Sequence, residues 1–185
     1  MFIQTEQTPN PATLKFLPGR TVMESGTANF PERGAATARS PLAERLFQLP
    51  EVGGVFLGSD FITVTKTEDS EWRQVKPAVL AAIMEHFTAG HPVVIGAPEA
   101  ADPGAASEED DEIVAQIKEL LETRVRPAVA MDGGDITFED FEDGIVYLHM
   151  QGACSGCPSS TATLKAGIEN MLRHYIPEVV EVRAV

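Results

Sequence analysis

The chain has 185 residues, of which 43% are hydrophobic, and it carries a formal net charge of −14. This apolar share is normal for a globular protein that buries a core. The negative charge, with no basic stripe, argues against a nucleic-acid partner because the phosphates would be repelled. No apolar run approaches the roughly 20 residues that a membrane-spanning helix needs, so we expect no membrane insertion.

The N-terminal stretch MFIQTEQTPNPATLKFLPG has no basic region followed by an apolar segment, so we expect no secretory signal. It is not rich in Arg and Ser, and we expect no transit peptide unless one has already been removed. Two cysteines in a chain of this length do not make a disulfide framework, and a reducing compartment fits them better. We therefore expect a cytoplasmic location, or the mitochondrial matrix if a transit peptide has been removed.

The charge is distributed unevenly. Residues 97–112 contain no basic side chain and have a net charge of −7, whereas residues 1–96 have a net charge of −2. The acidic stretch is rich in Ala, Pro and Gly, and it cannot bury enough apolar surface to offset the entropy lost on ordering. We predict a first domain over 1–96, a flexible acidic linker over 97–107 and a second domain over 108–185. Ser107 is the expected N-cap of a helix that follows the linker.

The first domain begins with an extended stretch over 13–17 that ends in a Pro-Gly turn. Residues 40–50 predict a short helix with a Ser-Pro start, and residues 53–68 predict two strands around a turn at 58–60. Four apolar residues spaced four apart over 75–87 then predict a helix that ends at Gly90. We expect Trp72 to be a core or helix-anchoring residue.

The second domain begins with a helical apolar stripe over 113–125, which we expect Pro127 to break. Two alternating strands follow, joined by a hairpin turn at 142–144. A helix that starts at Pro158 has an apolar face, and a final strand covers 179–185. The members of that helix face are Leu164, Ile168, Met171, Leu172, Tyr175 and Ile176. The predicted fold class is α+β, with two small domains that each pack helices on a small, mainly antiparallel sheet.

Cys154 and Cys157 are the only cysteines, and they lie in the sequence GACSGCP just before the last helix. The unpaired N–H groups and positive dipole end of a helix N-terminus favour thiolate over thiol. Gly152 and Gly156 permit positive φ and a close approach of the backbone. We therefore expect the two thiols to be exposed, acidic and directed the same way.

Four interpretations of this pair remain open from the residues alone. Buried structural thiols do not need glycine on both sides, and a thioredoxin-type redox pair ends a strand of a βαβ unit, which this pair does not. A zinc site needs about four ligands, and His149 and His174 lack the spacing to supply them. We expect His149 to be a strand residue and His174 a helix-surface residue. An iron–sulfur cluster also needs about four thiolates, and a two-fold dimer would supply them by symmetry.

Three neighbouring features have two interpretations each: the stretch 132–135, Thr161 and Thr163. Residues 132–135 are a tight turn or a loop near the mouth of a cluster site, and we favour the turn. Thr161 and Thr163 could donate hydrogen bonds to sulfur, although such residues more often satisfy backbone groups at a helix start.

Two stretches together resemble the Nfu family, in particular its NifU-like C-terminal domain: RPAVAMDGGDI (126–136) and GACSGCPSSTATLKAGIENML (152–172). The similarity covers 108–185, and every motif position is present. The opening FIQTEQTPNPATLKFLPG and the stretch SPLAERLFQLPEVGGVFLGSDFITVTK resemble the N-terminal domain found in one branch of that family.

The resemblance implies an iron–sulfur cluster scaffold or carrier that is not an enzyme. It implies that Cys154 and Cys157 bind a 4Fe–4S cluster, and through it iron, shared between two protomers of a homodimer. The cluster would come from an upstream scaffold and be delivered to apo iron–sulfur proteins, while the N-terminal domain selects partners. The alternative from the residues is a thiol–disulfide oxidoreductase that uses the same pair.

Overall fold

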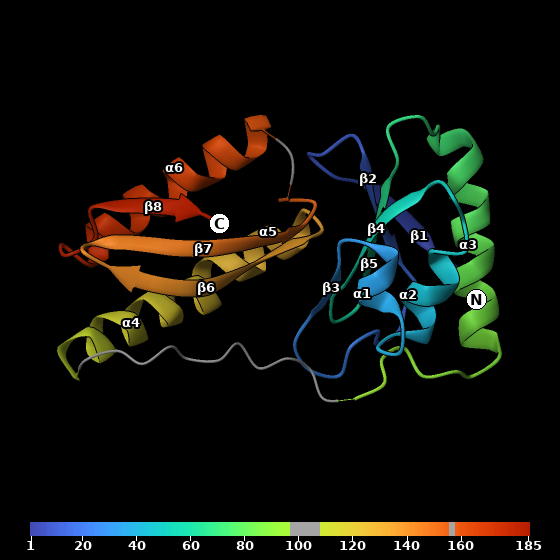
Figure 1. Ribbon diagram of the computed structural model, residues 1–185, viewed down its shortest axis with the longest axis horizontal. Coiled ribbons are helices and arrows are strands. Elements are labelled where there is room, and N and C mark those ends of the chain that lie inside the picture. The colour runs from blue at the N-terminus through green and yellow to red at the C-terminus, as the bar shows by residue number, and fades with distance from the viewer. Residues whose placement is uncertain (97–107, 156–157) are drawn as a thin grey trace. The chain divides into compact units, whose positions relative to one another are not determined.

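The computed structural model describes residues 1–96, 108–155 and 158–185. The chain divides into two compact units, Met1–Glu99 and Ala100–Val185. Each unit packs helices on a single sheet, which confirms the α+β class (Figure 1). The predicted linker over 97–107, with its expected N-cap Ser107, lies outside the described residues. Within the described part of the chain, no helix has the length and apolarity that crossing a membrane requires.

The N-terminal unit contains a five-stranded antiparallel sheet in the order β1-β2-β5-β4-β3. Three helices accompany the sheet, and α2 and α3 cover one of its faces (Figure 1). The strands are β1 (Gln4–Gln7), β2 (Thr13–Leu17), β3 (Ala28–Phe30), β4 (Val52–Leu57) and β5 (Ile62–Lys66). The helices are α1 (Arg33–Ala36), α2 (Pro41–Leu46) and α3 (Trp72–Thr88).

Alternation along the central strands builds the core of this unit. Leu14 and Phe16 of β2 point to the side of the helices, where they join Val79 and Ile83 of α3 in one buried cluster. The predicted start of α2 is confirmed, because the Ser40 side chain accepts a hydrogen bond from the Ala43 N–H at 3.0 Å. The predicted strands over 53–68 and the end of α3 near Gly90 are confirmed as well.

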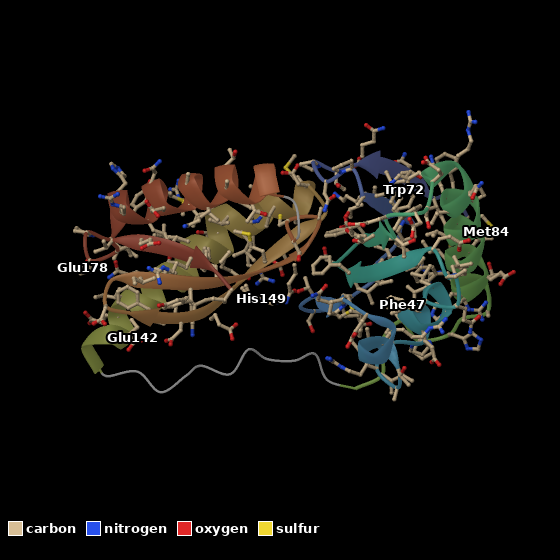
Figure 2. The ribbon with its side chains drawn as sticks, turned by 45° about the horizontal axis from the view of Figure 1, so that its top comes forward. Phe47, Trp72, Met84, Glu142, His149 and Glu178 are labelled. Carbon is tan, nitrogen blue, oxygen red and sulfur yellow. The ribbon has the colours of Figure 1, made fainter. Side chains whose placement is uncertain are left out.

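Three elements of this unit were not predicted, namely β1, β3 and α1. Strands β1 and β3 are the two edges of the sheet, and β1 is too polar to show an apolar alternation. Helix α3 begins at Trp72, earlier than the periodic stretch indicates. Its indole Nε1 donates to the Pro11 carbonyl at 3.0 Å, and its ring centroid lies 6.5 Å from that of Phe16. Figure 2 shows Trp72 at this end of α3, consistent with the predicted anchoring role.

The C-terminal unit has a three-stranded sheet in the order β6-β7-β8, in which β6 and β7 are antiparallel and β8 is parallel to β7. Its helical and extended elements follow the predicted order α-β-β-α-β. They are α4 (Glu108–Leu120), the π-helical turn η1 (Leu121–Val125), α5 (Arg126–Met131), β6 (Gly134–Glu142), β7 (Ile145–Gly152), α6 (Pro158–Tyr175) and β8 (Glu181–Ala184).

One buried cluster holds this unit together. Val146, Leu148 and Met150 alternate along β7 and face Ile117 of α4 and Leu172 of α6. The helices on both sides of the hairpin in sequence therefore cover the same face of the sheet (Figure 1). Burial of this face supplies the main stabilisation, at about 25 cal/mol for each Å² of apolar surface removed from water.

The hairpin prediction is confirmed in detail. Glu142 pairs with Ile145, and Asp143 and Gly144 between them both have positive φ, 52° and 79°. A two-residue turn with positive φ at both positions matches the right-handed twist of the strands. Figure 2 shows Glu142 at this end of the sheet and His149 farther along β7.

Two expectations for the helices are wrong. Pro127 does not break the helical segment, which continues through η1 and α5 to Met131. The wider π turn explains this, because the Arg126 N–H bonds to the Leu121 carbonyl five residues back and gives the proline ring room. Tyr175 does not share the buried face of α6, since 48% of its surface is exposed. The other predicted apolar positions of α6 belong to the core or pack against it.

Candidate functional site

Cys154 follows β7 in a tight turn ahead of α6. Gly152, at the end of β7, has φ of 64°, which turns the chain as the glycine prediction requires. The Ser155 N–H then bonds to the Gly152 carbonyl at 3.1 Å, and the Ala153 N–H bonds to the Gly133 carbonyl at 3.2 Å. These contacts fix the backbone on both sides of Cys154 and attach this turn to the segment before β6.

The first turn of α6 also contacts the cysteine. Thr161 donates its hydroxyl to the Cys154 carbonyl at 3.1 Å. Thr161 therefore satisfies a backbone group in this contact, as we expect of such residues near a helix start. Helix α6 begins at Pro158, as predicted. Cys157 and Gly156 lie outside the described residues, and no geometry is assigned to them.

The Cys154 side chain is buried, which makes the expectation of an exposed thiol wrong for this residue. Only 7% of its surface is accessible, and it belongs to the core cluster of the C-terminal unit. The expectation of an exposed thiol rests only on the glycine loop and the helix N-terminus, and neither shows what packs against the sulfur. The structure adds the core cluster to which the cysteine belongs and the start of β6, which lies against the sulfur.

Gly134, the first residue of β6, makes this close approach possible. A Cβ built on Gly134 would lie 2.6 Å from the Cys154 sulfur, 2.9 Å from the Gln151 carbonyl oxygen and 3.0 Å from the Cys154 nitrogen. Real Cβ atoms essentially never approach other atoms this closely, so no larger residue fits here without a shift. In the strand register Gly134 pairs with Gly152, which places two glycines next to the cysteine.

The stretch 132–135 is in part the predicted turn. Asp132 and Gly133 form a turn after α5, with φ of 80° at Gly133, and that part of the turn prediction is confirmed. Gly134 and Asp135 already belong to β6. Gly134 lies against the Cys154 sulfur, so the stretch borders this cysteine, and its place at the mouth of a cluster site stays a prediction.

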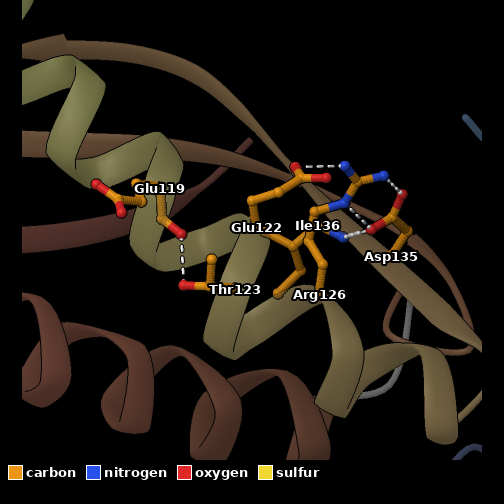
Figure 3. Close-up of polar contacts among 6 residues, drawn as sticks. All are labelled: Glu119, Glu122, Thr123, Arg126, Asp135 and Ile136. Carbon is orange, nitrogen blue, oxygen red and sulfur yellow. Dashed lines mark hydrogen bonds and ion pairs between the residues drawn. The ribbon is translucent and has the colours of Figure 1, made fainter.

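A partly buried ion pair that the sequence does not predict lies beside Gly134. Arg126 donates from Nε and Nη2 to the two carboxylate oxygens of Asp135, both at 2.8 Å, and from Nη1 to Glu122 at 2.7 Å (Figure 3). Asp135 is 3% exposed. The hydrogen bonds to Asp135 are the largest cause that raises the pKa of the Arg126 guanidinium above its ordinary value, so the side chain stays charged. No sequence periodicity links these two positions, because they lie on different elements.

The remaining candidates lie away from Cys154 or have other roles. His149 is a β7 residue whose Nδ1 lies 3.2 Å from the Val185 carbonyl oxygen, and His174 is exposed on α6, both as predicted. Within residues 1–96, 108–155 and 158–185, no group of three or more His, Cys, Asp or Glu side chains is arranged to hold a metal ion. In the described part of the site, the sulfur of Cys154 is thus the candidate metal ligand.

Comparison with known proteins gives matches to both units. The family model described as scaffold protein Nfu/NifU N terminal matches residues 3–90, and the model of the NifU-like domain matches residues 117–183. The human NFU1 iron-sulfur cluster scaffold homolog, mitochondrial, is 55% identical and covers 100% of this chain, which spans 72% of the human protein. NifU-like protein 4, mitochondrial, of Arabidopsis thaliana is 56% identical, with 97% of this chain and 64% of the plant protein covered.

The solution NMR structure of a NifU-like protein from Saccharomyces cerevisiae also matches, with a TM-score of 0.47 and 26% identity. The match covers 52% of this chain and 87% of the yeast chain. This chain spans about two thirds of the length of the human and plant relatives it matches.

Proposed function

Because the chain belongs to the Nfu family of iron–sulfur cluster scaffold proteins, we propose that it binds a labile 4Fe–4S cluster as cargo and passes it to apo-proteins. Cys154 and Cys157 are the ligands, and the cluster is shared between two chains. The family membership rests on the two domain matches and on the identity to the human and plant relatives. The names of these relatives, a cluster scaffold and a NifU-like protein, support an iron–sulfur cluster as the cargo.

The observation that carries the proposal is the place of Cys154. It is one of only two cysteines, and its sulfur lies at the loop before α6, within the NifU-like region, with its backbone held on both sides. A cluster of this type takes about four cysteine thiolates, and one chain supplies two. A two-fold dimer completes the set, because each chain brings the same pair to the axis.

Transfer is a ligand exchange and not a turnover reaction, and the protein is not an enzyme in this proposal. A thiolate of the acceptor forms a bond to a cluster iron, and the iron–sulfur bond to Cys154 or Cys157 breaks in return. Each exchange replaces one thiolate by another, so the cluster keeps its charge and no electron donor is needed. The same exchange, run from an upstream scaffold, loads the dimer.

The names of the human and plant relatives include the word mitochondrial. They favour the mitochondrial alternative over the cytoplasmic location that we expect from the sequence. Neither the family matches nor these names support the thiol–disulfide oxidoreductase alternative. Reduction of a disulfide substrate by the metal-free protein, if observed, would favour that alternative.

Anaerobic reconstitution followed by native mass spectrometry tests the proposal. The loaded protein should have the mass of two chains plus one cluster of about four irons, and it should gain the broad visible absorption of a cluster. Cys154→Ala and Cys157→Ala should each abolish both signals. A single-cysteine variant that still holds a full cluster, or an intact cluster on one chain without an added thiol, would refute the proposal.

A further inference from the structure

Arg126 joins two carboxylates on different elements, one of them buried. Its exposed side meets Glu122, whose side chain is 67% accessible, and its buried side meets Asp135, whose side chain is 4% accessible. Asp135 uses both oxygens for the guanidinium, and its Oδ1 also accepts the Ile136 N–H at 2.8 Å. Such two-pronged, charge-assisted contacts fix the orientation of both partners more firmly than a single hydrogen bond does.

The π-helical turn explains why Arg126 lies at this position. Residues Leu121–Val125 form the wide turn, and the Arg126 N–H closes it on the Leu121 carbonyl. A π turn inserts one extra residue into a helix and changes the direction in which the following side chains point. Such turns often occur at functional sites. Here the helix reaches α5 with Arg126 facing both the preceding turn and the start of β6 (Figure 3).

A short path of contacts leads from this ion pair to the cysteine sulfur. Asp135 follows Gly134 in β6, and Gly134 is the residue whose missing side chain admits the Cys154 sulfur. On the other side of Gly134, the Gly133 carbonyl accepts the Ala153 N–H. Two contacts therefore hold the start of β6. One is the ion pair of Asp135 with Arg126, and the other is the hydrogen bond from the cysteine loop to the Gly133 carbonyl.

We propose that Arg126, through its ion pair with Asp135, is a positioning residue that holds the start of β6 against Cys154 and thereby fixes where this thiol meets the cluster. The inference rests on the proposed function for its purpose, although the contacts belong to the protein alone. Groups that orient metal ligands without touching the metal commonly set how firmly the metal is held. Glu122, on the exposed side of Arg126, does not have this role.

Thiol labelling of the metal-free protein tests the positioning directly. In a Cys157→Ser background Cys154 is the only thiol, and its rate of reaction with dithiobis(nitrobenzoate) reports how often β6 and the loop separate. Arg126→Gln and Asp135→Asn should each raise the rate by about tenfold or more, as the loss of a charge-assisted hydrogen bond predicts. The double variant should react no faster than the faster single variant, because both changes break the same pair.

Two controls separate positioning from general loss of stability. Glu122→Gln removes only the exposed contact of Arg126 and should leave the rate within about twofold of the parent. Val182→Ala weakens the buried core at β8, away from the contact path, and its rate should rise only as far as global unfolding in urea accounts for. The inference fails if Arg126→Gln labels at the parental rate. It also fails if the rate increases of Arg126→Gln and Asp135→Asn add in the double variant. It fails as well if Val182→Ala, at the same global stability as Arg126→Gln, accelerates labelling as much as Arg126→Gln does.

The chain with both cysteines gives a second measurement. After reconstitution, Arg126→Gln should lose its cluster to an iron chelator several-fold faster than the parent and the Glu122→Gln control, and equal rates would overturn the inference. A parent that binds no cluster would refute the proposed function. In that case the labelling series would still decide the positioning role, so the two failures are distinguishable.

Discussion

Replacing Gly134 by alanine is the sharpest test of how the cysteine site is built. The substitution adds a single methyl group, and the backbone of Gly134 is not in the positive-φ region, so an alanine there meets no conformational penalty. Any loss of stability must therefore come from what the methyl group touches. It touches the Cys154 sulfur, the Gln151 carbonyl oxygen and the Cys154 nitrogen, all at 3.0 Å or less.

The cost follows from these three contacts. Two of the three atoms belong to the backbone of β7 and the loop, so a rotation of the Cys154 side chain alone cannot relieve the overlap. Overpacking of this kind costs about 1–3 kcal/mol of stability. Alanine lowers the conformational entropy of the unfolded chain, which offsets about 0.4–1 kcal/mol of that cost. We expect Gly134→Ala to lower the free energy of unfolding of the C-terminal unit by roughly 1–2 kcal/mol and to displace the sulfur.

Gly167 provides a matched control in the same unit. It lies on the exposed side of α6, and a Cβ built there meets nothing within 4 Å. Gly167→Ala adds the same methyl group without a clash, and alanine favours a helix interior over glycine by about 0.5–1 kcal/mol. The two variants should therefore shift stability in opposite directions.

Urea unfolding measures both variants. Trp72 is the only tryptophan and lies in the N-terminal unit, whereas both tyrosines, Tyr147 and Tyr175, lie in the C-terminal unit. In a Trp72→Phe background, tyrosine fluorescence therefore follows the C-terminal unit alone. If Gly134→Ala proves as stable as its parent and its Cys154 thiol reacts at the parental rate, the loop yields easily and the argument from close packing is wrong.

Two further predictions concern the N-terminal unit, which Trp72 fluorescence follows. Ser40→Ala should lower the free energy of unfolding of this unit by about 1–2 kcal/mol, because the hydroxyl both caps α2 and donates to the Val93 carbonyl at 2.6 Å. Ser40→Thr should recover part of the loss. An unchanged urea midpoint for Ser40→Ala would exclude the capping role. Burial lowers the pKa of His86 in the fold, so the unfolded chain takes up a proton first: stability should stay level above about pH 6.5 and fall below it. His86→Gln should remove that dependence, and a parent whose stability rises on acidification would contradict it.

Local chemistry explains which elements the sequence predicts well. The Ser40 cap, the Asp143-Gly144 turn and the Pro158 start of α6 each depend on a few neighbouring residues, and the structure reproduces all three. The edge strands β1 and β3 escape prediction because their pairing partners, not their own residues, define them. The identity of a strand at a sheet edge is a tertiary property, and a short polar segment does not reveal it.

The Pro127 error has a similar origin. The rule that proline ends a helix assumes regular hydrogen bonds, and a π turn in front of the proline removes the clash on which the rule depends. The ion pair of Arg126 with Asp135 depends on the same irregular turn, so neither could be read from periodicity. The sequence offers only a weak signal, the aspartate directly after two glycines, because nothing in the sequence shows that it is buried and therefore requires a cationic or hydrogen-bonding partner.

The burial of Cys154 shows that the Cys-x-x-Cys motif is only part of the site. The motif, its glycines and the helix behind it predict an exposed thiol, because they describe one side of the sulfur. The other side is Gly134, which Asp135 and Arg126 hold in place through contacts that the motif does not contain. In a chain with an intact GACSGCP loop, a larger residue at position 134 would still force the Cys154 sulfur to move. Under the proposed function, such a chain would keep its two cysteines but present Cys154 to the cluster from a different position.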